Sequence, residues 1–147
     1  MADSFALSRF LTAQDNGGIF ERAVAELRRG QKQSHWMWFV FPQLDGLGRS
    51  SMARLYAISG LAEARAYLAH PVLGPRLEAC AAIVAGTPGR TAAEIFGPVD
   101  AMKLRSSVTL FAQADPARPA FQQILDRYFD GVPDPVTAAR LQRSSLR

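Results

Sequence analysis

The chain has very little of what marks secreted and membrane proteins. It contains one cysteine, Cys80, so no disulfide can form within it, which is typical of proteins in a reducing compartment. No stretch approaches the roughly 20 consecutive apolar residues that a membrane-spanning helix needs. The N-terminal Met-Ala-Asp-Ser-Phe lacks the basic and then apolar pattern of a secretory signal. These absences predict a cytoplasmic protein with no membrane partner.

The chain also lacks the common metal and cofactor motifs. Two histidines and one cysteine stand at unrelated spacings, which argues against a zinc site. The glycine-bearing loop over residues 46–51 lacks the Gly-Lys-Ser/Thr ending of a phosphate-binding P-loop. There is no Gly-x-Ser-x-Gly nucleophile elbow and no dinucleotide fingerprint after a strand. We therefore expect neither a metal nor a cofactor, and whether the protein is an enzyme stays open.

Positive charge is concentrated only at the C-terminus. The net charge is +4, and Arg140, Arg143 and Arg147 lie in the last eight residues, which contain no acid. Without those eight residues the chain has 14 basic and 13 acidic side chains, whereas DNA-binding domains display a concentrated basic face. We predict a single domain over residues 1–139, followed by a basic, frayed tail over residues 140–147.

Helical periodicity dominates the apolar residues. Stripes at intervals of three and four residues run over 20–27, 61–68, 73–84 and 121–129. Thr91 with Glu94 has the spacing of a capping box, and Asp134 before Pro135 that of an N-cap followed by a first-turn proline. His70 stands at a helix end, where capping of carbonyls is expected. Together these signals predict an all-α domain of about six to eight short helices.

The apolar segment over residues 35–44, His-Trp-Met-Trp-Phe-Val-Phe-Pro-Gln-Leu, does not show its secondary structure. Its aromatic and β-branched residues favour a strand, while Ser34 could cap a two-turn helix, and Pro42 ends either one. Both faces of so apolar a segment must be buried. We therefore place it at the centre of the core and leave strand and helix open.

The most informative helix is predicted over residues 98–113. On a helical projection, Asp100, Lys103 and Ser107 share the apolar inward arc, whereas Arg105 and Thr109 point away. One interpretation is structural: an Asp100–Lys103 ion pair with the Ser107 hydroxyl bonded back to a helix carbonyl. The other is a polar pocket wall, in which Lys103 and Ser107 bind an anion and Asp100 orients it or acts as a base.

A second set of candidate site residues surrounds the aromatic segment. His35 could supply acid–base chemistry, Lys32 could hold a phosphate, and Trp36 or Trp38 could stack on a ring. Gln43 could recognise an amide or a purine edge. The structural alternative is that the histidine caps a buried segment, the tryptophans fill the core and the glutamine satisfies a turn.

Several stretches resemble the Domain of Unknown Function 1810 family, to which the label calpastatin is sometimes wrongly attached. The matching stretches are Gly30-Gln31-Lys32, His35 to Leu44, Gly46-Leu47-Gly48-Arg49-Ser50, Glu63 to Leu68, His70 to Leu77, Phe96-Gly97, Asp100, Lys103-Leu104, Ser106-Ser107, Thr109-Leu110-Phe111, Asp134 and Thr137. Val108 stands where the pattern has methionine. The resemblance covers nearly the whole chain and implies a compact all-α domain, but it implies little about function.

Three classes of function follow from these residues. The leading hypothesis is a domain that binds or hydrolyses a phosphorylated or nucleotide-like small molecule, with His35 and Asp100 as catalytic residues. The second is a non-enzymatic module that binds a protein partner through an exposed patch. The third, and least favoured, is nucleic-acid binding through the arginine tail.

Overall fold

The computed structural model describes residues 3–145, with side chains described as far as Arg143. The helices are α1 (Ser8–Asp15), the 3-10 turn η1 (Asn16–Gly18), α2 (Ile19–Arg28), α3 (Met37–Val40), α4 (Ser51–Leu55), α5 (Leu61–Ala69), α6 (Leu73–Gly86), α7 (Ala92–Phe96), α8 (Pro98–Ala114), α9 (Pro119–Tyr128) and α10 (Pro135–Ser145). In the described range there is no strand, and one isolated parallel bridge pairs Leu44 with Ile58. The all-α prediction is confirmed.

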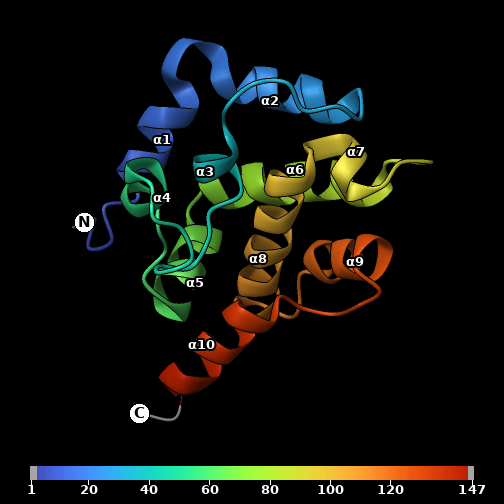
Figure 1. The fold of residues 1–147 in the computed structure, drawn as a ribbon. Coiled ribbons are helices and arrows are strands. Elements are labelled where there is room, and N and C mark those ends of the chain that lie inside the picture. Colours follow the sequence, from blue (N-terminus) through green and yellow to red (C-terminus); the bar gives the residue numbers. More distant parts are fainter. Residues whose placement is uncertain (1–2, 146–147) are drawn as a thin grey trace.

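Helix α8 lies in the middle of the molecule (Figure 1) and packs against α5, α7, α9 and α10. Every residue from Ser106 to Phe111 is buried, because neighbouring elements cover the helix on all sides. Thr109, which was predicted to point away from the core, is therefore buried, and its hydroxyl accepts a hydrogen bond from the Asp134 backbone N–H at 2.9 Å. A helical projection with one apolar inward face therefore does not predict which residues of α8 are buried.

The aromatic segment forms one short helical turn, α3, in the core. Trp36 and Phe41 are fully buried, and their rings lie 6.5 Å apart, with Phe96 from α7 within 6.5 Å of both. Between residues 36 and 42, Trp38 alone is half-buried. Ser34 does not cap the helix: Trp36 occupies the N-cap position, and the Ser34 hydroxyl donates to Glu26 instead.

The predicted helix caps are present, with one difference. Thr91 and Glu94 form the capping box at the start of α7, and the Asp134 carboxylate accepts the Thr137 N–H at the start of α10. The His70 side chain accepts hydrogen bonds from backbone N–H groups, whereas the sequence predicted that it would cap carbonyls. Its Nδ1 accepts from the backbone of Val72 and Leu73, so the imidazole begins α6 rather than ending α5.

The C-terminal segment is part of the folded domain as far as the structure describes it. Helix α10 continues through Ser145, so residues 140–145 are helical and not the frayed tail predicted from their sequence. Leu141 is only 2% exposed, and its burial explains why the helix is held against α8. Residues 146 and 147 of the predicted tail lie outside the described residues. Between residues 3 and 145, no helix has the length and apolar character needed to cross a membrane.

A cationic pocket between the 43–50 loop and helices α8 and α10

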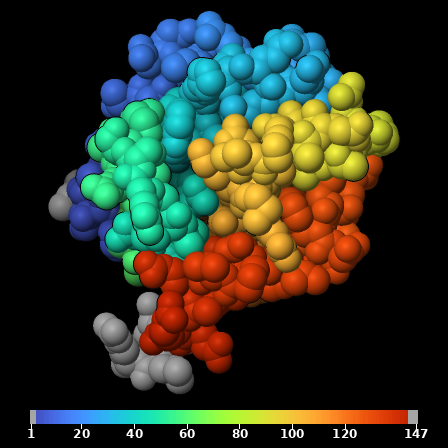
Figure 2. All heavy atoms as spheres, in the orientation of Figure 1, coloured from blue at the N-terminus to red at the C-terminus, as the bar shows by residue number. Residues whose placement is uncertain are grey.

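A pocket of about 500 Å³ opens where three parts of the chain meet. The loop contributes Gln43, Arg49 and Ser50, α8 contributes Val99, Met102, Lys103 and Ser106, and the start of α10 contributes Asp134 and Val136. In the space-filling view the green loop, the orange first half of α8 and the red α10 surround this hollow on one face (Figure 2). The volume lies within the usual range for small-molecule sites.

Backbone contacts fix the loop that forms one wall. The Asp45 N–H donates to the Ile58 carbonyl and the Ile58 N–H to the Gln43 carbonyl, both at 2.8 Å, which ties the start of the loop to the segment that follows α4. Gly46 has φ +91°, and a Cβ at this position would overlap the guanidinium of Arg140. Arg140 of α10 thus lies directly on the loop backbone, and glycine is required there for two reasons.

Two lysines share one carboxylate beside the pocket. Lys32 Nζ lies 2.8 Å from Asp100 Oδ2, and Lys103 Nζ lies 3.5 Å from Asp100 Oδ1. Lys32 also donates to the Ser34 carbonyl, and its side chain is 7% exposed, against 25% for Lys103. The expected i,i+3 pair is present, but Lys32 is the closer partner. The triad of Lys32, Asp100 and Lys103 therefore carries one surplus positive charge, at the more exposed lysine.

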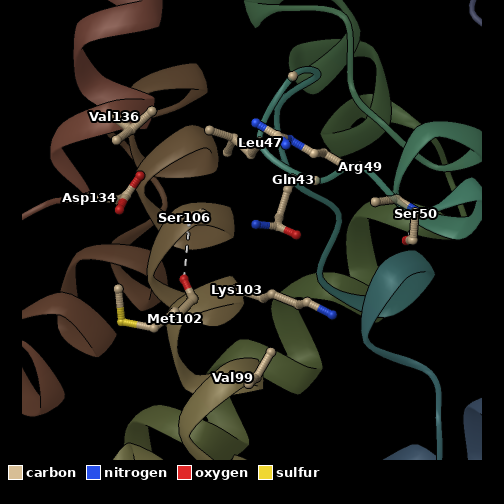
Figure 3. Close-up of a pocket in the computed structure, with 13 residues that line it drawn as sticks. Gln43, Leu47, Arg49, Ser50, Val99, Met102, Lys103, Ser106, Asp134 and Val136 are labelled. Carbon is tan, nitrogen blue, oxygen red and sulfur yellow. Dashed lines mark hydrogen bonds between the residues drawn. The ribbon is translucent and has the colours of Figure 1, made fainter.

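Several donors at the pocket are not used by the protein. Gln43 projects between the loop and α8 (Figure 3), and neither its amide nor the Arg49 guanidinium makes a hydrogen bond with the described residues. The Ser50 oxygen accepts the Ala53 N–H, which leaves its hydroxyl proton free to donate. Asp134 is the one acid in the lining, and its carboxylate already accepts two hydrogen bonds from Thr137.

The two tryptophans are covered by the lysines and the core. Trp36 is fully buried, its Nε1–H donates to Glu26, and Lys32 Nζ lies 5.0 Å from its ring centre. Lys103 Nζ lies 5.1 Å from the ring centre of Trp38. These are cation–π distances. Trp36 offers no surface for stacking on a ligand, and one face of Trp38 is occupied by Lys103.

Two further predicted residues do not line this pocket. His35 is exposed and forms no hydrogen bond within the described part of the chain. Ser107 is fully buried, and its hydroxyl lacks a hydrogen-bond partner, so the back-bond to a helix carbonyl predicted for it is absent. The neighbouring Ser106, which does line the pocket, bonds back to the Met102 carbonyl at 3.2 Å instead.

A buried carboxylate, Glu26, organises the segment that carries Lys32. It accepts the N–H groups of Gln33 and Ser34, the Ser34 hydroxyl and the Trp36 indole N–H. Burial by itself would raise the pKa of Glu26, but these four hydrogen bonds outweigh it and lower the pKa to about 2. The ionised Glu26 therefore fixes the chain between α2 and α3, and with it the position of Lys32.

Sequence reasoning missed the residues that the loop and α10 bring to the pocket. Arg49 and Ser50 lie in a loop that was given no role in the site, and Arg140, which contacts this loop at Gly46, was assigned to a frayed tail. The usable signal was Gly46 and Gly48, since glycines in a loop mark places where other groups approach the backbone closely. Within the described residues, no three His, Cys, Asp or Glu side chains are grouped as a metal site would require.

The comparisons with known proteins agree with the fold and give no activity. Residues 4–141 match the family described as protein of unknown function (DUF1810), a range that includes all three walls of the pocket. The chain is similar to the conserved hypothetical protein Rv1873 from Mycobacterium tuberculosis, with 51% identity and a TM-score of 0.92 for its crystal structure. The match covers 95% of this chain and 99% of that one. No curated protein matches the chain.

Proposed function

The chain belongs to the DUF1810 family of proteins of unknown function, and we propose a function from its own residues. The protein binds a phosphorylated small molecule in the pocket between the 43–50 loop, α8 and α10. The observation that carries this proposal is the gathering of one surplus cation, Lys103, and three donors that the protein does not use at one pocket. Lys103, Arg49, Gln43 and Ser50 all border the space, and the only acid in its lining is already bonded.

A phosphate group suits these donors better than a neutral ligand does. Hydrogen bonds between charged donors and phosphate are about twice as strong as neutral ones. Asp100 and the Trp38 ring hold the ammonium group of Lys103 in position to bind a phosphate. Lys32 also pairs with Asp100, so the single carboxylate neutralises only one of the two lysines. Binding an anion would neutralise that surplus charge.

The proposal is for binding, and the acid–base assignments stay predictions. Asp100 lies between two lysines, where its evident role is to position Lys103. His35 lies outside the pocket lining, so it would take part in chemistry only if the ligand extends beyond the pocket. The lone thiol of Cys80 fits the reducing cytoplasm, which we propose as the location of the protein.

The test is an NMR titration of the ¹⁵N-labelled protein with inorganic phosphate, at constant ionic strength balanced with chloride. We expect saturable shifts of the Gly46, Gly48 and Lys103 amides. Binding should be roughly 10- to 100-fold weaker in Lys103→Met, since a hydrogen bond to a charged group contributes roughly 1.5–3 kcal/mol. Arg22→Met is the matched control, because Arg22 is an exposed cation on α2 outside the pocket lining. Equal weakening in both variants, or no saturable shift, would contradict the proposal and favour a protein-binding role.

A further inference from the structure

The pocket has an apolar wall opposite its cationic one. Six large hydrophobic side chains are exposed among the described residues, and three of them, Val99, Met102 and Val136, line this single pocket. Their exposed fractions are 67%, 53% and 56%. Singly scattered apolar residues are normal on a protein surface, whereas a cluster beside a pocket marks a binding surface.

The exposed apolar side chains lie on α8 and α10, whereas most of the unused donors lie on the loop that faces them. Val99 and Met102 lie one turn apart on α8, and Val136 lies in the first turn of α10. Arg49 and Ser50 come from the loop on the other side, with Gln43 and Lys103 between (Figure 3). A ligand that fills the pocket would therefore meet donors on the loop side and aliphatic side chains on the α8 and α10 side, where the carboxylate of Asp134 is already bonded to Thr137.

The apolar wall contains no aromatic ring. None of the residues lining the pocket is aromatic, Trp36 is buried in the core, and Lys103 already covers one face of Trp38. A nucleobase bound here would lack the aromatic partner on which such rings commonly stack. The wall is suited instead to an alkyl chain, which needs only apolar area to cover.

From this arrangement we infer that the ligand is an amphiphilic anion, a phosphate monoester whose organic group is aliphatic, with the phosphate at Lys103 and Arg49 and the chain along Val99, Met102 and Val136. This inference rests on the proposed function and narrows its ligand class. Covering these three side chains removes apolar surface of both protein and ligand from water, so affinity should rise with chain length.

The experiment compares methyl phosphate, hexyl phosphate and 1-hexanol in the same NMR titration. A fully buried methylene strengthens binding by roughly 4-fold, so hexyl phosphate should bind about 30-fold more tightly than methyl phosphate if half of the added chain is covered. In the double variant Val99→Ser, Val136→Ser the ratio of the hexyl phosphate affinity to the methyl phosphate affinity should fall below about 5-fold. Leu55→Ser is the control, since Leu55 is as exposed as Met102, at 53%, but does not line the pocket.

The outcomes separate this inference from the proposal beneath it. Equal affinity for methyl and hexyl phosphate would contradict the inference that the ligand carries an aliphatic chain, and it would leave the proposal of phosphate binding intact. Equal affinity for 1-hexanol and hexyl phosphate would overturn the anion site, and no binding of any probe would overturn both. A chain-length effect that survives in the double variant would show that the chain binds elsewhere and would also overturn the inference. The variants should fold, because both valines are more than half exposed.

Discussion

Glu26 shows how one buried charge can be stable when its hydrogen bonds are complete. Glu26 is 2% exposed, and four hydrogen-bond donors contact its two carboxylate oxygens. Removing water from a carboxylate is costly, and only a full set of hydrogen bonds offsets that cost. Because all four donors come from residues 33–36, the charge of Glu26 holds the segment that enters the core at Trp36.

We predict that Glu26→Gln loses most of its destabilising effect at low pH. The folded pKa of Glu26 is about 2 and its ordinary value is 4.5, so the unfolded chain binds more protons between these values. The stability that the ionised group provides is fully present above pH 4.5 and is lost as pH falls toward 2. Urea unfolding should show a cost of about 2–3 kcal/mol at pH 7, and a smaller one at pH 3.

The control for this prediction is Glu21→Gln, an exposed acid on the same helix. It should change the free energy of unfolding by less than about 0.5 kcal/mol at either pH. A cost of Glu26→Gln that is equal at pH 7 and pH 3 would show that the carboxylate is not ionised in the folded protein.

We predict that Cys80 is inert in the native protein. The side chain is fully buried on α6, and burial raises the pKa of the thiol to about 12, with Arg76 opposing the shift. The thiolate is the reactive form, so an alkylating reagent should modify the chain only after unfolding. Mass spectrometry after iodoacetamide treatment at pH 8, with and without urea, measures this. Fast native modification would mean that α6 opens readily.

At the scale of single elements, Gly46 and Arg140 connect the loop to α10. We predict that Gly46→Ala weakens phosphate binding by several-fold and destabilises the protein, because its Cβ would displace the Arg140 guanidinium in addition to the cost of φ +91°. Gly89→Ala is the matched control: Gly89 also has positive φ, at +68°, but no atom lies within 4 Å of the added Cβ. It should lose stability only and keep its phosphate affinity, both measured by thermal melting with and without phosphate.

Elements with one buried face could be predicted from the sequence, and those buried on several sides could not. The stripes of α2, α6 and α9 and the caps of α7 and α10 rest on local spacing, which the structure confirms. On helix α8 the prediction that Thr109 points away from the core was wrong, because α10 and the segment before it cover that side of the helix. Nothing local to residue 109 indicates that a later helix packs there.

The candidate site shows the same limit. The spacing of Asp100 and Lys103 is local, and their pairing was predictable, whereas the closer ion pair with Lys32 spans 68 residues of chain. Arg140 was assigned to a frayed tail because it lies in the basic, acid-free end of the chain, and its contact with Gly46 depends on how α10 docks. Long-range contacts of this kind decide which of the predicted polar residues share a pocket.

For the molecule as a whole, the docking of α10 decides whether the chain unfolds as one unit. Leu141 is 2% exposed, Thr137 is fully buried, and α10 packs on α8, which itself contacts α5, α7 and α9. The tryptophans lie in and beside α3, which stands apart from α10 in Figure 1. If α10 were an independent tail, its loss would leave the surroundings of Trp36 and Trp38 unchanged.

We predict a single cooperative transition that includes α10. Leu141→Ala should destabilise the protein by about 2–4 kcal/mol, as large-to-small substitutions in a core do, while Arg143→Ala, at an exposed position two residues away, should change it by less than about 0.5 kcal/mol. Urea transitions followed by far-ultraviolet circular dichroism and by tryptophan fluorescence should superimpose, and Leu141→Ala should shift both equally. A shift seen in the dichroism alone would mean that α10 detaches before the core unfolds, and the wall that Val136 provides would then belong to a mobile element rather than to a fixed pocket.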